Sequence, residues 1–376
     1  MGRARILVVD DESGMLRSME RVLAPQHEVK GVRTPAHALE VAAGFEPDLA
    51  ILDIRMPEMD GFSLMGELKS RHPGIDVILM TGSVNEPDAR LIRALREKAF
   101  YFIHKPFERD VLLTLVHRCL EVRRLADENR RHVRRLEDEL DAARSFQLSL
   151  LPDDSGRAGP LVIAARYLPC VELCGDFFDY AALGEDEATL IVTDVSGHGA
   201  SAAMLTGMIK LAFRSAAEDD YAPASVVRRI SESLPLLGER HYITAICVRV
   251  RRQLGRLEYA NAGHPPGFLI GADGSIVALE STGPIVHTAL HGRDWEERML
   301  SFSEADRLFL YTDGLTEAAS LTEHYGRERL EAELKRSRDG GGDLLDAVLD
   351  SVTAFRAGRP QDDDVAVLVA RPVFDS

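Results

Sequence analysis

Short apolar runs that stop at polar residues alternate with helix-length amphipathic stretches over the first third of the chain. The apolar runs cover residues 6–9, 49–52, 77–80 and 101–103. The stretches between them cover residues 15–23, 35–43, 63–70 and 88–98. Such an alternation is typical of strands and helices in turn, so it predicts a doubly wound, parallel α/β sheet.

A pattern with a period of seven follows. Residues 111–150 contain no Gly or Pro and are rich in Arg, Glu, Leu and Ala, which predicts one long helix. One heptad position holds Leu115, Val122, Asn129, Leu136, Ala143 and Leu150. The companion position is only half apolar and holds Arg118, Leu125, His132, Glu139 and Phe146. This predicts a weak, switchable parallel coiled-coil dimer in which Asn129 can fix the register. The alternative is a helix packed on one domain.

The remaining residues mix strand and helix patterns in an α+β arrangement. Strand patterns include residues 245–251 and 257–261, and helix patterns include residues 202–214, 224–234 and 344–355. The whole chain is therefore predicted to be multidomain. We expect an α/β domain at 1–122, a helical connector at 123–150 and an α+β domain at 151–376.

Composition limits the partners. A length of 376 residues and a hydrophobic content of 45% are enough for two domains with separate cores. The net charge of −16 disfavours nonspecific binding to nucleic acid or to anionic membranes. The arginines of the connector are interleaved with acidic residues, which favours a solvated, salt-bridged helix face over a nucleic-acid patch.

Cysteine usage and the lengths of the apolar runs indicate the compartment. Cys119, Cys170, Cys174 and Cys247 show no paired Cys-x-x-Cys spacing, which disfavours a disulfide framework or a zinc site and fits a reducing cytosol. No signal peptide precedes the first strand, and no apolar run is long enough to cross a membrane. We therefore expect a cytoplasmic protein.

Charged and hydroxyl side chains follow the apolar runs of the first domain. They are Asp10, Asp11, Asp53, Thr81 and Lys105. Functional groups of a doubly wound sheet lie outside the carboxyl ends of its strands, so we expect these side chains to lie together. Asp-Ile-Arg-Met-Pro-Glu-Met-Asp-Gly at 53–61 and Lys-Pro-Phe at 105–107 carry a resemblance. Residues 3 to about 122 resemble the flavodoxin-like receiver domain of two-component response regulators.

The receiver resemblance implies phosphorylation. Asp53 would accept a phosphoryl group from a sensor histidine kinase. Asp11, Asp53 and the Arg55 carbonyl would hold Mg²⁺ with the help of Asp10. The metal would offset charge on the transferring group.

Three further residues match the positions of the receiver switch. Lys105 would pair with the phosphoryl oxygens, and Thr81 would donate a hydrogen bond that exists only after phosphorylation. Phe102 occupies the switch-aromatic position, although an aromatic residue on a strand can also be plain core. The sequence departs from the family pattern at Lys98, where Gly is usual, and at Tyr101, where Asp is frequent. These departures affect the contacts of the output face and not the phosphorylation chemistry.

Four aspartate-centred motifs are spread over the last domain. They are Gly-Asp-Phe-Phe-Asp at 175–179, Asp-Val-Ser-Gly-His-Gly at 194–199, Tyr-Thr-Asp-Gly at 311–314 and Asp-Asp-Asp at 362–364. Three of them adjoin short apolar runs, which places carboxylates at strand ends where they can converge. Oxygen ligands without a His or Cys pair suit Mg²⁺ or Mn²⁺ rather than zinc. Each motif alone could be a turn, but four together indicate a metal site.

Longer motifs in this domain carry a second resemblance. They are Gln-Leu-Ser-Leu-Leu-Pro at 147–152, Asn-Ala-Gly-His-Pro-Pro at 261–266 and Tyr-Thr-Asp-Gly-Leu-Thr-Glu-Ala at 311–318. Residues 145–371 resemble the PPM-type (PP2C-like) serine/threonine phosphatases, in the SpoIIE/RsbU-like bacterial branch that controls sigma factors and stress responses. The resemblance implies a β-sandwich of two antiparallel sheets flanked by helices, with metals in a cleft at one end.

The phosphatase resemblance also implies the metal ligands, and with them the catalytic residues. Asp194 would bridge two Mn²⁺ or Mg²⁺ ions, helped by the Val195 carbonyl. Asp176 would complete the coordination of one ion, and Asp313 with Asp363 that of the other. The two ions would activate a water molecule aligned with the phosphoester.

Other polar residues of these motifs have a structural interpretation. His198 and His264 lie in glycine-rich turns and are expected to be structural rather than general acids. Residues that would support the ligands or cap backbone groups are Asp179, Glu317, Asp362 and Asp364. Cys174 stands where the family often has Gly, and Ala366 where it often has Thr, but neither position is a metal ligand.

Together these patterns predict a response-regulator phosphatase. Phosphorylation at Asp53 would act on the connector or the dimer, and the last domain would remove phosphate from Ser or Thr of a protein. The resemblance points to an anti-sigma-factor antagonist, a small STAS-domain protein, as substrate. The alternative is a non-enzymatic adaptor that only binds a sigma factor or another partner, but loss of metal carboxylates would mark it and all four are present. A DNA-binding regulator is disfavoured because the sequence has no DNA-reading motif.

Overall fold

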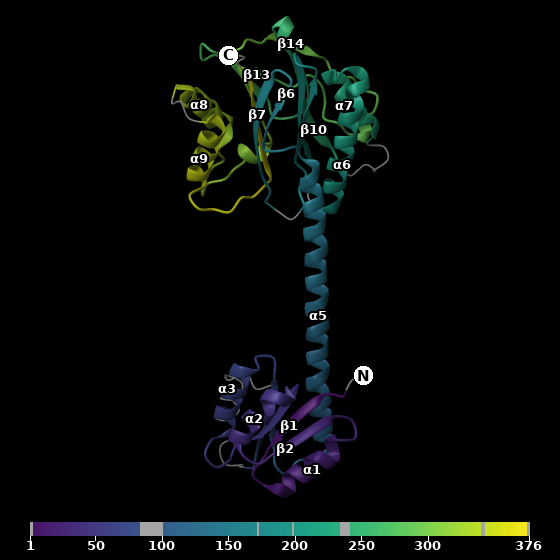
Figure 1. The fold of residues 1–376 in the computed structure, drawn as a ribbon, viewed down its shortest axis with the longest axis vertical. Coiled ribbons are helices and arrows are strands. Elements are labelled where there is room, and N and C mark those ends of the chain that lie inside the picture. Colours follow the sequence, from purple (N-terminus) through teal and green to yellow (C-terminus); the bar gives the residue numbers. More distant parts are fainter. Residues whose placement is uncertain are drawn as a thin grey trace. The chain divides into compact units, whose positions relative to one another are not determined.

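The computed structural model describes residues 3–82, 101–170, 173–197, 199–233, 241–339 and 343–373 (Figure 1). The chain divides into two compact units, Met1–Leu136 and Glu137–Ser376. The division falls inside one helix, α5 (Arg109–Leu150), which includes the predicted connector. Each unit has hydrophobic cores of its own.

The first unit is a doubly wound α/β fold, as predicted. Its parallel sheet has the order β2-β1-β3-β4-β5. The strands are β1 (Arg5–Val9), β2 (Glu28–Val32), β3 (Leu49–Asp53), β4 (Asp76–Thr81) and β5 (Tyr101–His104). The helices are α1 (Ser13–Leu23), α2 (Pro35–Phe45) and α3 (Gly61–Arg71). The helix predicted at 88–98, which contains Lys98, lies outside the described residues.

Both faces of this sheet are covered by helices. Successive residues of a strand point to opposite faces of its sheet. Leu7 and Val9 accordingly pack in the core formed with α2 and α3. Ile6 and Val8 pack in the core formed with α1 and the start of α5. Alternate residues of one short apolar run therefore serve two cores, which is why the run contains no polar position.

The predicted long helix is present as α5, with 42 residues. Its first turns are anchored, because Leu112, Val116 and Cys119 are buried in the core of the first unit. Farther along, large apolar side chains are exposed, among them Val122 at 51% and Leu136 at 59%. The helix therefore packs on the first unit at its start and presents apolar side chains to solvent beyond that.

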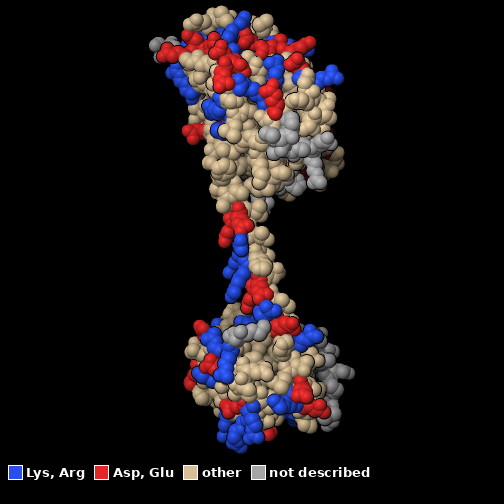
Figure 2. Space-filling view, turned by 90° about the vertical axis from the view of Figure 1, so that its right-hand side faces the viewer, with Lys and Arg blue, Asp and Glu red and all other residues tan. Residues whose placement is uncertain are grey.

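Charged side chains of both signs also line α5 (Figure 2). Arg124 pairs with Glu128 at 2.8 Å, and Arg118 lies 3.9 Å from Glu121. These are exposed pairs one helical turn apart, which add only a few tenths of a kcal/mol each. Within the described residues, no helix is both long enough and apolar enough to cross a membrane.

The second unit is a sandwich of two antiparallel sheets, as predicted. The sheets have the orders β14-β11-β10-β9-β8 and β13-β12-β15-β16-β7-β6. Strands of the first are β8 (Phe177–Leu183), β9 (Glu187–Val195), β10 (Ile243–Arg251), β11 (Arg256–Ala262) and β14 (Arg298–Ser301). Strands of the second are β6 (Ser155–Ala158), β7 (Leu161–Leu168), β12 (Gly267–Ile270), β13 (Ile276–Leu279), β15 (Arg307–Tyr311) and β16 (Val365–Pro372).

Helices cover the outer faces of the sandwich (Figure 1). α6 (Ala200–Ser215) and α7 (Pro223–Ser233) pack on the first sheet. α8 (Gly326–Asp339) and α9 (Leu344–Arg356) pack on the second. The inner faces meet in a core to which Val192 and Val248 contribute from one sheet and Leu310 and Leu368 from the other.

Strand pairing brings the aspartate motifs to one end of the sandwich. In an antiparallel pair, the start of one strand lies beside the end of its neighbour. β8 pairs with β9 so that Phe177 faces Thr193, and β15 pairs with β16 so that Tyr311 faces Val367. Each sheet therefore carries two of the four motifs at one end of its strands.

Candidate functional site

Two groups of acidic residues are candidates for function, one in each unit. In the first unit, Asp10 follows β1 and Asp53 ends β3. Asp10, Asp11 and Asp53 each offer a carboxylate oxygen, and these oxygens lie within 4.8 Å of one another. Such a set of oxygen donors fits a hard divalent cation. The first unit thus brings together the three carboxylates that the sequence predicted.

Lys105 completes this cluster from the end of β5. Its Nζ donates to Asp10 Oδ2 at 2.6 Å and to Asp53 Oδ2 at 2.9 Å. Burial alone would lower the pKa of Lys105, but the hydrogen bonds from its ammonium group to both carboxylates outweigh this and raise that pKa. Burial raises the pKa of Asp10, and the hydrogen bond from Lys105 opposes only part of the increase. The cluster therefore holds its lysine charged beside two carboxylates.

The remaining predicted receiver residues lie on or after β3, β4 and β5. Thr81 is buried at the end of β4, and the Arg55 backbone N–H donates to Asp53 Oδ1 at 3.4 Å. Phe102 is partly buried against the core and lies edge-on to His104 with ring centroids 5.1 Å apart. Tyr101 is half exposed. The packing of Phe102 fits both interpretations offered by the sequence, a switch position and a core aromatic.

In the second unit, carboxylates from both sheets meet at one end of the sandwich. Asp176 precedes β8, Asp194 lies in β9, Asp313 follows β15 and Asp363 precedes β16. The backbone is closely packed here, because a side chain at Gly314 would place its Cβ 1.9 Å from the Asp364 carbonyl oxygen. Only glycine fits such an approach.

The electrostatics of this second cluster are unfavourable for charge. Burial, followed by the charges of Asp313 and Asp363, raises the pKa of Asp194 to about 7. Burial, followed by Glu317 and Asp363, raises the pKa of Asp313 to about 6. Burial and then the charge of Asp194 raise the pKa of Asp176 well above its usual value. Ionised carboxylates that destabilise one another in this way fit a site for divalent cations.

Hydrogen bonds orient two buried carboxylates at this end of the sandwich, Asp176 and Asp364. The Thr312 hydroxyl donates to Asp176 Oδ2 at 2.6 Å, which leaves the other oxygen available. The Asp364 carboxylate accepts from the Cys170 backbone N–H at 2.8 Å. The Asp364 N–H in turn donates to Asp363 Oδ1 at 2.8 Å. Thr312 and Asp364 are thus positioning groups. The sequence predicted a supporting role for Asp364, whereas for Thr312 its place beside Asp313 was the only signal.

One close grouping was not predicted. Cys170, Asp363 and Asp364 offer ligand atoms within 4.8 Å of one another, whereas Asp176, Asp194 and Asp313 form no such group among the described residues. The Cys170 thiol does not suit a hard cation, and burial, followed by the Asp364 charge, raises its pKa to about 12. We therefore regard the Cys170 thiol as a protonated neighbour of the aspartates.

Of the two histidines in the motifs, His264 lies within the described residues. His198 lies outside the described residues. His264 is fully enclosed, with Nδ1 2.7 Å from the Thr244 hydroxyl and Nε2 3.0 Å from the Tyr311 carbonyl oxygen. Burial lowers the pKa of His264 to about 3. The imidazole is therefore neutral and forms a hydrogen bond at each nitrogen, one to β10 and one to β15. This agrees with the structural role predicted for His264.

The end of α5 is joined to this cluster by Gln147. Its side chain is buried, donates to the Cys174 carbonyl oxygen at 2.6 Å and accepts from the Cys174 N–H at 3.1 Å. It also contacts the Thr206 hydroxyl of α6 at 3.3 Å. Cys174 lies two residues before Asp176, so the helix end and a candidate ligand share one short segment. The sequence showed Gln147 only as part of a motif, not as a contact.

A second link joins the same helix end to β8. Lys210 of α6 donates to the Leu150 carbonyl oxygen and lies 3.3 Å from Asp179. Asp179 is fully buried and also pairs with Arg214 at 2.7 Å. The interpretation of Asp179 as a supporting residue therefore agrees with its contacts.

Comparisons with known protein families agree with this geometry. Residues 184–373 match the family model of "Stage II sporulation protein E (SpoIIE)", and residues 6–117 match that of the response regulator receiver domain. The phosphoserine phosphatase RsbP of Bacillus subtilis is 31% identical over 187 residues, which cover 47% of this chain and 45% of RsbP. Protein IcfG of Synechocystis is 26% identical over 273 residues, covering 65% of this chain and 43% of IcfG. The chain spans less than half the length of these relatives.

Solved structures show the same fold. The SiaA-PP2C domain of Pseudomonas aeruginosa aligns with a TM-score of 0.56 at 20% identity, covering 65% of this chain and 99% of that domain. The RsbU and RsbW domains of a Mycobacterium tuberculosis protein align with a TM-score of 0.51 at 25% identity, covering 59% of this chain and 63% of that one. The second unit therefore has a PP2C-like fold.

The raised pKa of Asp194 predicts a pH-dependent stability difference. A carboxyl group whose pKa is higher in the folded state contributes stability below its unfolded pKa and loses it as the pH rises through the folded pKa. For Asp194 this window runs from its usual value of 3.8 to about 7. Without divalent cations, Asp194→Asn should match the wild type near pH 4 and exceed it above pH 7, by at most ~4 kcal/mol.

Thermal unfolding with EDTA, and with Mg²⁺ or Mn²⁺, checks this prediction. At pH 8, either cation should make the wild type more stable than Asp194→Asn, because only the wild type keeps the carboxylate that binds the cation. A stability difference that is equal at both pH values, with and without cation, would contradict the assignment of Asp194.

Proposed function

The chain belongs to the SpoIIE family, and on this basis we propose that it is a metal-dependent protein serine/threonine phosphatase controlled by its receiver domain. The observation that carries the proposal is the convergence of four carboxylates from two sheets at one end of a PP2C-like sandwich. Three of these carboxylates have a raised pKa, which a bound cation would lower. A non-enzymatic adaptor would not require this arrangement.

The residues of this centre have distinct roles in the proposed hydrolysis. Asp194 and the Val195 carbonyl would hold two Mn²⁺ or Mg²⁺ ions together, with Asp176 on one side and Asp313 and Asp363 on the other. When bound, the ions would supply an activated water and would neutralise charge on phosphoryl oxygens. Thr312 fixes one oxygen of Asp176 and so presents the other.

The receiver supports control by phosphorylation. Asp53 would accept a phosphoryl group from a sensor histidine kinase, with Mg²⁺ held by Asp10, Asp11, Asp53 and the Arg55 carbonyl. Lys105 already contacts the Asp53 carboxylate, at 2.9 Å, and would then pair with the phosphoryl oxygens. Thr81 would donate to the new group, and Phe102 would respond as the switch aromatic.

We infer that the signal reaches the phosphatase centre through α5. The first turns of the helix pack in the receiver core, and Gln147, in its last turn, is hydrogen-bonded to both backbone groups of Cys174. A rotation or shift of the helix end would therefore act on the backbone that carries Asp176. A change from 1:99 to 99:1 between two such states needs ~5.5 kcal/mol of differential stabilisation.

An exposed face of α5 supports a parallel homodimer as the element that changes. The predicted heptad position includes Val122 and Leu136, which are exposed. Four residues after Val122, Asn129 and Leu136 lie Ala126, Val133 and Leu140, all apolar and all exposed. This second row is more apolar than the companion position predicted from the sequence. Two apolar rows at spacings of four and three form a coiled-coil seam.

The proposed substrate is a phosphoprotein, specifically an anti-sigma-factor antagonist of the STAS class. Support comes from the resemblance of the motifs to the bacterial SpoIIE/RsbU-like branch and from the similarity to a phosphoserine phosphatase, RsbP. Hydrolysis of the purified phosphorylated antagonist, measured beside a generic phosphoester, tests this assignment.

The first functional prediction concerns the metal centre. Asp194→Ala and Asp313→Ala should each lower Mn²⁺-dependent hydrolysis of p-nitrophenyl phosphate by more than ~100-fold, because loss of a direct ligand should exceed loss of a supporting partner. Circular dichroism should show an unchanged fold. Asp294→Ala, which removes an exposed carboxylate 3.2 Å from Arg228, serves as the matched control. Undiminished turnover in Asp194→Ala would refute the two-metal assignment.

The second functional prediction concerns the receiver. Asp53→Ala should remove the response of turnover to acetyl phosphate, because the acceptor carboxylate is gone while the second unit is intact. Asp110→Ala, which removes an exposed carboxylate in the first turn of α5, should keep the response. A response that persists in Asp53→Ala would show that control does not use Asp53.

The third functional prediction concerns the connector. Leu136→Pro should disconnect receiver phosphorylation from turnover, because proline inside a helix costs ~3 kcal/mol or more and interrupts its hydrogen bonds. Leu136→Ala keeps the helix and is the matched control. Turnover is measured with and without acetyl phosphate. A Leu136→Pro protein with the full response would show that the domains communicate without an intact α5.

A further inference from the structure

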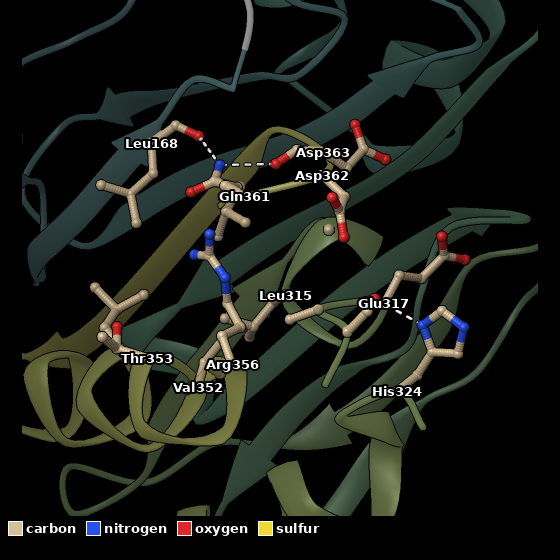
Figure 3. A pocket seen from close by; sticks show the side chains of 15 residues that line it. Leu168, Leu315, Glu317, His324, Val352, Thr353, Arg356, Gln361, Asp362 and Asp363 are labelled. Carbon is tan, nitrogen blue, oxygen red and sulfur yellow. Dashed lines mark hydrogen bonds between the residues drawn. The ribbon is translucent and has the colours of Figure 1, made fainter. Parts of the chain in front are cut away.

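A pocket of about 190 Å³ lies beside the phosphatase centre (Figure 3). Its apolar walls come from Leu168, Leu315, Leu349, Val352 and Val365. Gly314 and Asp363 also line it, so the pocket shares a wall with the carboxylate cluster. Pockets for drug-sized ligands measure ~300–1,000 Å³. This pocket is smaller and suits one amino-acid side chain.

Arg356 supplies the cation of this pocket. It is the last residue of α9, and Figure 3 shows its guanidinium group reaching into the pocket towards Gln361. Within the described part of the chain, its one hydrogen bond runs from Nη2 to the Arg359 carbonyl oxygen at 3.1 Å, and it forms no ion pair. A half-buried guanidinium group between apolar walls lacks both full hydration and a counterion, so a carboxylate would stabilise it.

Gln361, the neighbouring polar residue, does not pair with Arg356. The Gln361 side chain donates to the Leu168 carbonyl oxygen at 2.6 Å and to the Asp363 carbonyl oxygen at 2.7 Å, so it braces the aspartate loop instead. Glu317 lies on the side of His324 in Figure 3, and the three acidic residues of the lining, Glu317, Asp362 and Asp363, are exposed to solvent. Water and salt screen exposed charges far more than half-buried ones. Among the charged residues that line the pocket, Arg356 is the half-buried one, so its charge is the least screened.

We infer that this pocket binds the carboxylate side chain of a Glu or Asp near the phosphoserine of the substrate, and that Arg356 determines this specificity. The inference rests on the proposed phosphatase function and adds the chemistry that the substrate must carry. An extended chain advances ~3.3–3.6 Å per residue, so a phosphoserine at the metal centre places residues within about three positions next to the pocket. The guanidinium fork can then bind the carboxylate through two parallel hydrogen bonds.

Phosphoserine peptides test the inference. In one set, each position from three before to three after the phosphoserine is Glu, Gln or Lys in turn, and kcat/KM with Mn²⁺ is measured for each peptide. The wild type should prefer Glu to Gln at one or two positions by about 10- to 100-fold, as expected for a hydrogen-bonded charge pair. In Arg356→Gln the ratio of kcat/KM for Glu to that for Gln should fall to about one, and in Arg356→Lys it should stay above one. Arg356→Glu should prefer the Lys peptide at the same position.

Arg359→Gln is the matched control. Arg359 is exposed and lies three residues from Arg356, and its substitution removes the same charge. Because Arg359 does not line the pocket, the Glu-to-Gln ratio should remain unchanged. Each ratio is internal to one variant, so a general loss of turnover does not alter it. Melting temperatures check that the variants fold.

Several outcomes would overturn the inference. They are a wild-type ratio near one at every position, a ratio unchanged in Arg356→Gln, and an equal loss in Arg359→Gln. An equal loss on all peptides in Arg356→Gln, with the ratio kept, would place Arg356 at the phosphate instead. Absence of wild-type turnover on both the peptides and p-nitrophenyl phosphate would remove the proposed function, and the inference with it.

Discussion

Repulsion among carboxylates held together by strand pairing is the constraint on which the second unit depends. Asp194 lies in β9, and Asp176, Asp313 and Asp363 directly adjoin β8, β15 and β16, so strand pairing limits how far the four can separate. Burial and neighbouring charge raise the pKa of Asp194 to about 7 as a result. Gly314, after β15, lets the backbone approach that of Asp364, before β16, more closely than any side chain would allow. Divalent cations would offset this repulsion, and the bound cations would then neutralise charge on phosphoryl oxygens.

The same rigidity explains how α5 could control the centre. Gln147 binds both backbone groups of Cys174, and Lys210 joins the Leu150 carbonyl oxygen to Asp179. Both contacts end on the segment that carries Asp176. A rigid ligand set is sensitive to small displacements of one member, because coordination depends steeply on distance and direction. Control through α5 would therefore need only a local shift at its end.

Local pattern predicted the elements well. The alternation of apolar runs predicted the doubly wound sheet, and the absence of Gly and Pro predicted α5 within a few residues of its ends. It also predicted that carboxylates lie at the ends of strands. The heptad analysis was less complete, because the apolar row with Val133 and Leu140 lies four residues after the first row, not three. The contacts of Gln147 and Thr312 were missed, because a motif shows which residues occur and not what they touch.

The sequence by itself determined which segments are strands and helices and which residue types stand at their ends, because these depend on the local period of apolar residues. Only the tertiary structure decided which ends meet. Thr312 and Asp176 are 136 residues apart, yet their side chains lie 2.6 Å apart. The pocket of Arg356 likewise combines α9 with the loops that precede and follow two strands. Such contacts depend on strand order and on helix packing over a sheet, and a local pattern contains neither.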